Sequence, residues 1–104
     1  MDAQPNIIET VRNFALEIKN KGIKLNKIYL YGSYAKNMQL PHSDIDVALI
    51  SDDFIGVGFV DIKKFISVLR NYILIQPRTY YTKDFDKGDP FIEEIKKTGR
   101  EIVI

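Results

Sequence analysis

The chain of 104 residues lacks cysteine, a strong net charge and any long hydrophobic run. The absence of cysteine excludes disulfides, thiolate zinc sites and a cysteine nucleophile, and it suits a reducing compartment. No apolar run approaches the roughly 20 residues that a membrane-spanning helix needs. The net charge of +1 gives no strong nucleic-acid signal. The N-terminal segment carries acids and no long apolar core, which argues against a signal peptide. We therefore expect a soluble, cytoplasmic protein.

What remains is the composition of an ordinary globular domain, with 45% apolar and 28% charged residues. A chain of this length fits one domain with one modest core. The sequence shows no repeat, no low-complexity segment and no interdomain linker. We expect a single domain over residues 1–104.

Hydrophobic periodicity and turn residues divide the chain into alternating helices and strands. Pro77 is expected to end the third strand. We expect helices at residues 6–20, 33–38, 59–71 and 90–98, strands at residues 27–31, 45–50 and 72–76, and a closing strand or ordered tail at residues 101–104. This order predicts an α/β (α+β) fold with helices packed on a small sheet.

The stretch LYGSYAKNMQLPHSDIDVALI, residues 30–50, contains two unusual features. Gly32 and Ser33 interrupt an apolar strand, and Asp44 and Asp46 stand at the start of the next one. Side chains alternate along a strand, so the two carboxylates are expected on one face, about 7 Å apart. Paired carboxylates are oxygen ligands for a hard divalent cation such as Mg²⁺ or Mn²⁺. The two aspartates are therefore candidate metal ligands.

The Gly-Ser turn supplies a complementary phosphate site. Gly32 allows close backbone approach to a ligand, and the first amides of a following helix face an anion. The Ser33 hydroxyl can bind a phosphate oxygen. Lys36 is a further candidate phosphate ligand, although an exposed helix lysine is the more ordinary interpretation. A polyphosphate site beside a metal site is what nucleotidyl or phosphoryl transfer requires.

Each feature alone has an ordinary explanation. A Gly-Ser pair is usually only a turn, and Asp-x-Asp is most often a solvated loop or a helix cap. His42, beside a proline, is more often a solvated turn residue than a base. The functional interpretation depends on the joint pattern of strand, Gly-Ser, loop, acids and strand.

The stretch GSYAKN…HSDIDVALI resembles the signature of the nucleotidyltransferase superfamily related to DNA polymerase β. In length and in its tail, QPRTYYTKDFDKGDPFIEEIKKTGREI, the chain resembles the minimal members, the MNT proteins. The resemblance implies a mixed sheet, two divalent cations, and transfer of a nucleoside monophosphate from a nucleoside triphosphate, expected to be ATP. It implies that Gly32 and Ser33 bind the triphosphate and that Asp44 and Asp46 bind metal.

The resemblance also implies a partner. Minimal members often pair with a helical HEPN-type protein as antitoxin and toxin, and some attach AMP to a tyrosine of that partner. Two functions therefore stay open. One is a transferase acting on an acceptor such as a partner protein; the other is a weakly active or inactive antitoxin-like binding module for a HEPN-type partner. Transfer to a small molecule is the weaker alternative, because no second domain builds an acceptor pocket.

The sequence departs from the family pattern in two places. Asn37 stands where a glycine is usual, but asparagine tolerates left-handed geometry. Active members place a third acid on the following strand, which corresponds here to Gln76 or Tyr72. Neither is acidic; Gln76 can coordinate through its carbonyl oxygen but cannot act as a base. No other acid is an obvious substitute, because Asp61 belongs to the preceding helix and Asp84 lies beyond the strand. Loss of a base costs about 10²–10⁴-fold in rate.

The last third of the chain is rich in aromatic residues. Because the interior of a small domain is limited, some of these rings are expected at the surface, where aromatics mark interfaces. The residues concerned are Tyr72, Tyr80, Tyr81, Phe85 and Phe91. We therefore expect a homodimer or a hetero-complex.

Overall fold

The computed structural model describes residues 5–36, 38 and 43–104. Asn37, Pro41 and His42, considered above, lie outside the described residues. Among the described residues, four strands form one sheet in the order β3-β2-β1-β4. They are β1 (Lys27–Tyr31), β2 (Ile45–Ile50), β3 (Ile75–Tyr80) and β4 (Arg100–Glu101). β1 pairs antiparallel with β2 and β4, whereas β2 and β3 are parallel. The sheet is therefore mixed, as predicted.

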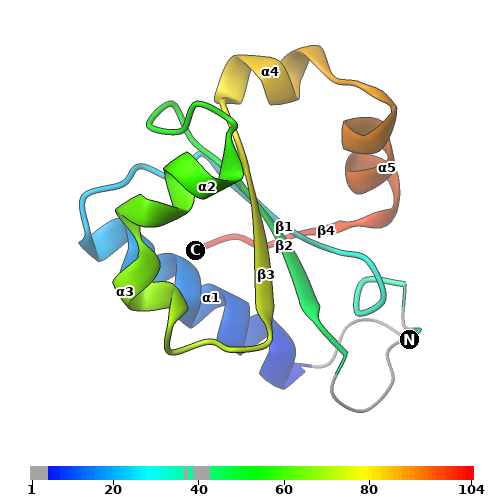
Figure 1. The fold of residues 1–104 in the computed structure, drawn as a ribbon. Coiled ribbons are helices and arrows are strands. Elements are labelled where there is room, and N and C mark those ends of the chain that lie inside the picture. Colours follow the sequence, from blue (N-terminus) through cyan, green and yellow to red (C-terminus); the bar gives the residue numbers. More distant parts are fainter. Residues whose placement is uncertain (1–4, 37, 39–42) are drawn as a thin grey trace.

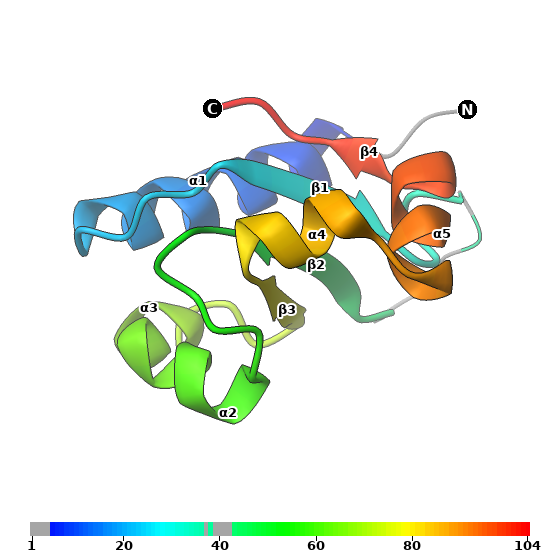
Figure 2. The same cartoon turned by 90° about the horizontal axis from the view of Figure 1, so that it is seen from above.

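Helices cover both faces of the sheet (Figure 1). One side carries α1 (Pro5–Asn20), α2 (Gly58–Asp61), the 3₁₀ helix η1 (Ile62–Lys64) and α3 (Ile66–Leu69); the other carries α4 (Thr82–Lys87) and α5 (Pro90–Thr98). Figure 2 shows α2 and α3 near the edge strand β3. None of the helices in the described part of the chain is long and apolar enough to span a bilayer. The α/β class predicted from the sequence is confirmed.

Strand β2 contributes to both apolar clusters of the core. Ile45, Val47 and Leu49 join the larger cluster, which includes residues of α1 and α3. Ala48 and Ile50 join the smaller one, which includes Phe85, Ile92 and Ile95 of α4 and α5. Because side chains alternate along a strand, Asp46 lies on the face of the smaller cluster. Strand β2 is therefore buried on both faces.

The helix predicted at residues 59–71 is broken into three short pieces. Phe65 leaves helical geometry, with φ −136° and ψ 23°, between η1 and α3. Its ring is fully buried, 6.1 Å from the ring of Phe14 and 5.9 Å from that of Phe54. Apolar spacing alone predicted one continuous amphipathic helix. The observed helix is interrupted at Phe65, the residue whose ring packs against Phe14 and Phe54.

Pro77 does not end the third strand, which runs from Ile75 to Tyr80 rather than over residues 72–76. The backbone N–H of Ile45 donates to Leu74 O, and that of Ser51 donates to Tyr80 O. Backbone groups of alternate β3 residues therefore face β2, and those of Pro77 face away from it. Since β3 is an edge strand, the missing N–H of Pro77 costs no ladder hydrogen bond.

The turn after β1 is not the helix predicted at residues 33–38. The N–H of Lys36 donates to Gly32 O over 3.1 Å, and that of Met38 donates to Ser33 O over 2.8 Å. These bonds close turns of different size, so the described residues of this segment form turns and not a regular helix. Helix α4 was not predicted, whereas α1 and α5 begin within one residue of their predicted starts and end as predicted.

Asp61 is a fully buried acid on the α2 side of the sheet. Its carboxylate accepts hydrogen bonds from the N–H groups of Ile55 (3.0 Å) and Gly56 (2.9 Å) and from Thr79 Oγ1 (2.8 Å). These bonds attach the loop before α2 to strand β3. Asp61 therefore has a structural explanation.

Replacing Asp61 with alanine should lower the free energy of unfolding by about 3 kcal/mol, because buried donors left unpaired cost roughly 1–3 kcal/mol each. Asp61→Asn retains one acceptor oxygen and should lose less. Urea denaturation measures both, with the exposed Asp52→Ala as the control. Equal stabilities for Asp61→Ala and Asp52→Ala would contradict this role.

Candidate functional site

Asp46 lies in a row of three residues that crosses the sheet. The strand register pairs it with Tyr31 of β1 and with Gln76 of β3. Residues paired directly across neighbouring strands share a face, so these three side chains point to the same side. Asp46 is half-buried and Gln76 is exposed. The row lies at the end of the sheet where β1 finishes and β2 begins.

Gly32 lies directly against the Asp46 carboxylate. Its φ of +74° is in the left-handed region that glycine adopts without strain. A Cβ at this position would overlap Oδ2 of Asp46 and lie only 3.1 Å from its Cγ. The position therefore requires glycine for two reasons, backbone conformation and space. The tertiary structure thus joins the Gly-Ser turn and the second aspartate, which are separate in sequence.

Asp44 precedes β2 and is exposed. Burial, and then the negative charge of Asp44, raise the pKa of Asp46 above its ordinary value. The two carboxylates are thus close enough to repel each other, and a bound cation would relieve this repulsion. Among the described residues, no group of three or more His, Cys, Asp or Glu could hold a metal ion. The pair fits a cation such as Mg²⁺, which usually binds one or two carboxylates together with substrate phosphates.

Two further candidate phosphate ligands, Ser33 and Lys36, belong to the turn after β1. Ser33 is half-buried next to Gly32. Lys36 is exposed, and its Nζ lies 3.3 Å from a carboxylate oxygen of Glu94 on α5. Lys36 therefore already has an anionic partner within the protein. This ion pair also connects the turn to α5.

The structure separates the two candidates for the third acidic position. The Tyr72 ring contacts Phe14 at 5.2 Å, and its hydroxyl donates a hydrogen bond to Glu17 of α1. Burial and Glu17 raise the pKa of Tyr72 to about 12. Tyr72 thus packs on the α1 face, away from the Asp46 row. Gln76, beside Asp46, occupies the corresponding place on β3.

The expectation that some of the C-terminal aromatic rings reach the surface is confirmed for Phe91, whereas others are packed inside the domain. Phe85 is fully buried, and Tyr72 packs against α1. Phe91 is 42% exposed and lies near Tyr31 and Arg78. Tyr31 and Arg78 were not predicted as neighbours of the site, because their proximity follows from the register of β1 and β3 with β2. Strand alternation along the correct span of β3 would have placed Arg78 on the face of Gln76.

Comparison with known proteins gives the class of this domain. Residues 10–102 match the nucleotidyltransferase domain family, so the chain belongs to that family. The resemblance to minimal nucleotidyltransferases seen in the sequence is thereby confirmed. No curated protein shows significant similarity to the chain.

Two solved structures share the fold. One is a presumed nucleotidyltransferase from Sulfolobus solfataricus, with 17% identity, a TM-score of 0.68, and coverage of 95% of this chain and 81% of that chain. The other comes from a crystal structure of a toxin–antitoxin with AMP-PNP, with 18% identity, a TM-score of 0.61, and coverage of 88% and 71%. At these identities the likeness concerns the fold.

The raised pKa of Asp46 predicts a pH-dependent cost to stability. Above pH 3.8, the ordinary pKa of an aspartate, the folded state binds more protons than the unfolded state, so stability falls as pH rises through the folded pKa. Asp46→Asn should therefore raise the free energy of unfolding at pH 7, and the gain should disappear below about pH 3.8. Urea denaturation across this range measures the effect. Asp44→Asn, which removes only the repulsion, should give a smaller gain; a gain for Asp46→Asn that is independent of pH would contradict the assignment.

Proposed function

We propose that this domain binds a nucleoside triphosphate, expected to be ATP, and transfers its nucleoside monophosphate to an acceptor hydroxyl. The observation that supports this most directly is the contact of Gly32 with the Asp46 carboxylate, since it joins a phosphate-binding turn to a pair of candidate metal ligands. In the proposed reaction the acceptor oxygen forms a bond to the α-phosphorus and pyrophosphate leaves. The hydroxyl proton passes to solvent, because the position of the third acid is occupied by Gln76, which cannot act as a base.

Each site residue has a proposed role. Asp44 and Asp46 would hold Mg²⁺ or Mn²⁺, which neutralises phosphate charge when bound. Ser33 would donate its hydroxyl to a phosphate oxygen, and Gly32 would admit the triphosphate close to the backbone. Lys36 would contact a phosphate only by leaving Glu94. The carboxyl pair thus serves the cation, and the turn serves the triphosphate.

A second function is favoured by specific features of the surface. Gln76 brings no charge to the third position, and Phe59 and Ile73 are 75% and 85% exposed. Ile73 also lines a groove of about 260 Å³ whose other apolar residues include Ile7 and Leu74, and grouped apolar surface is typical of interaction sites. The chain would then be an antitoxin-like subunit that binds a helical HEPN-type partner, or a second copy of itself, with weak or no transfer activity. The toxin–antitoxin neighbour is consistent with such a partner.

The metal and nucleotide assignment is tested by linked stability. ATP and Mg²⁺ together should raise the melting temperature more than either alone, because a ligand that binds only the folded state stabilises it. The double variant Asp44→Asn with Asp46→Asn should lose this increment. Asp52→Asn with Asp53→Asn removes the same charge from an exposed loop and serves as the matched control. A full increment in the double variant at positions 44 and 46 would exclude the metal assignment.

Gln76→Glu separates the two functions. A carboxylate beside Asp46 would add an acidic ligand and a base, so Mn²⁺ affinity should rise, and pyrophosphate release from ATP should rise about tenfold or more. Calorimetry and a pyrophosphate assay measure the two effects, with Gln76→Asn as the neutral control. Tighter Mn²⁺ binding without any turnover would support the binding module. An active wild type that Gln76→Glu leaves unchanged would show that this position needs no base.

A further inference from the structure

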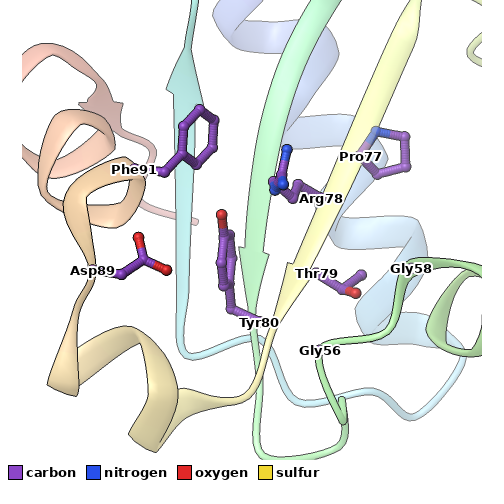
Figure 3. A pocket seen from close by; sticks show the side chains of 8 residues that line it. All are labelled: Gly56, Gly58, Pro77, Arg78, Thr79, Tyr80, Asp89 and Phe91. Atoms are coloured by element: carbon purple, nitrogen blue, oxygen red, sulfur yellow. The ribbon is translucent and has the colours of Figure 1, made fainter.

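A pocket of about 310 Å³ lies along β3, beyond the row of Tyr31, Asp46 and Gln76. Its lining comes from the loop before α2, from β3 and from the start of α5: Gly56, Gly58, Pro77, Arg78, Thr79, Tyr80, Asp89 and Phe91 (Figure 3). On the α5 side, Arg78 and Tyr80 of β3 face Phe91 and Asp89. This part of the pocket shares the sheet face of Asp46.

Aromatic side chains hold Arg78 in place. Its guanidinium carbon lies 4.6 Å from the centre of the Phe91 ring, in cation–π geometry. The Phe91 ring in turn packs edge-on against Tyr31, with ring centres 5.8 Å apart. Burial raises the pKa of the Tyr31 and Tyr80 phenols, and the nearby positive charge of Arg78 partly opposes this rise. The planar donor group therefore has few orientations left to lose on binding a ligand.

Within the part of the chain that the structure describes, no carboxylate forms an ion pair with Arg78. Burial raises the pKa of both phenols above 10, so they are neutral at physiological pH. The ion pairs found in the described part of the chain join Lys36 to Glu94 and Lys96 to Glu93, and neither involves Arg78.

Asp89 is the acidic residue of the pocket. One of its carboxylate oxygens accepts a hydrogen bond from the N–H of Ile92 and caps α5. Figure 3 shows the Tyr80 phenol between Asp89 and Arg78. Asp89 therefore does not occupy the donor face of the guanidinium.

The position of Arg78 relative to the candidate site is set by the sheet. Arg78 lies two residues after Gln76 and on the same face, about 7 Å further along β3. The Gly32–Ser33 turn is on the other side of Asp46, beyond β1. A triphosphate bound at that turn would lie beside the cation held by Asp44 and Asp46. Arg78 lies beyond Gln76 in the opposite direction, so it would be outside the triphosphate site.

We propose that Arg78, with Phe91 and Tyr80, forms a subsite for an anionic group, phosphate or carboxylate, on the acceptor of the transfer reaction. A guanidinium fork donates paired hydrogen bonds to such a group, and the two rings provide contact area for an aromatic or apolar part of the molecule. That this ligand is the acceptor of the transfer reaction rests on the proposed function. That the pocket binds an anion is independent of the proposed function.

The experiment uses phenyl phosphate as the probe and follows the protein by ¹H–¹⁵N NMR. Phenyl phosphate should shift the signals of Arg78, Tyr80 and Phe91, and neutral benzyl alcohol should not. Arg78→Gln should weaken phenyl phosphate binding about tenfold or more, as expected for loss of a charged hydrogen-bond donor. Arg78→Lys keeps the charge without the fork and should lose less. Arg70→Gln, at an exposed arginine after α3, is the matched control.

The same titration is repeated with AMP-PNP and Mg²⁺ at saturation. Phenyl phosphate affinity should stay within about twofold, because acceptor and nucleotide would bind together. Absence of binding in wild type, equal binding in Arg78→Gln, or displacement by AMP-PNP would each overturn the proposal; displacement would assign the pocket to the nucleotide. Should Arg78→Gln fail to fold, the Arg78→Lys titration and the displacement experiment decide. Arg78-dependent binding of phenyl phosphate without any AMP-PNP binding would overturn the proposed function and still support the anion site.

Discussion

Strand β2 is hydrogen-bonded on both sides and buried on both faces, and the rest of the domain is arranged around it. Its antiparallel pairing with β1 brings the Gly-Ser turn to its N-terminal end, and its parallel pairing with β3 brings Gln76 to the same end. A shift of one residue in either pairing would turn the partner side chains to the opposite face. The apolar residues of β2, which require two buried faces, therefore also determine the position of Asp46.

The consequence is a sheet face with two regions of opposite charge. Asp44 and Asp46 stand at one end, where their repulsion favours a cation, and Arg78 stands two residues beyond Gln76, without a carboxylate partner among the ion pairs described. In the proposed reaction, a metal-bound polyphosphate would occupy the first region and an anionic group of the acceptor the second. The neutral Gln76 lies between the two regions, and membership of the nucleotidyltransferase family does not by itself supply a base at this position.

Most of the fold could be predicted from local sequence. Local patterns placed α1, β1, β2 and α5 within one residue of their observed bounds, because the two helices bury one apolar stripe each and the two strands are short, mainly apolar runs. The errors arose where distant contacts outweigh local preference. Pro77 continues β3 because that strand is at the sheet edge, and Phe65 departs from helical geometry where its ring packs between Phe14 and Phe54. Neither the edge position nor the ring contacts are visible in a local window.

The same division applies to the site. The sequence by itself determined the residue types and their spacing: Gly32 and Ser33, then Asp44 and Asp46 at the start of a buried strand. These could be recognised because the Gly-Ser turn and the paired carboxylates occur together at a short, fixed spacing in the sequence. Only the tertiary structure decided that Gly32 touches Asp46, that Gln76 rather than Tyr72 lies beside it, and that Arg78 and Phe91 share a pocket. These contacts depend on strand register and helix packing, which join residues far apart in the chain.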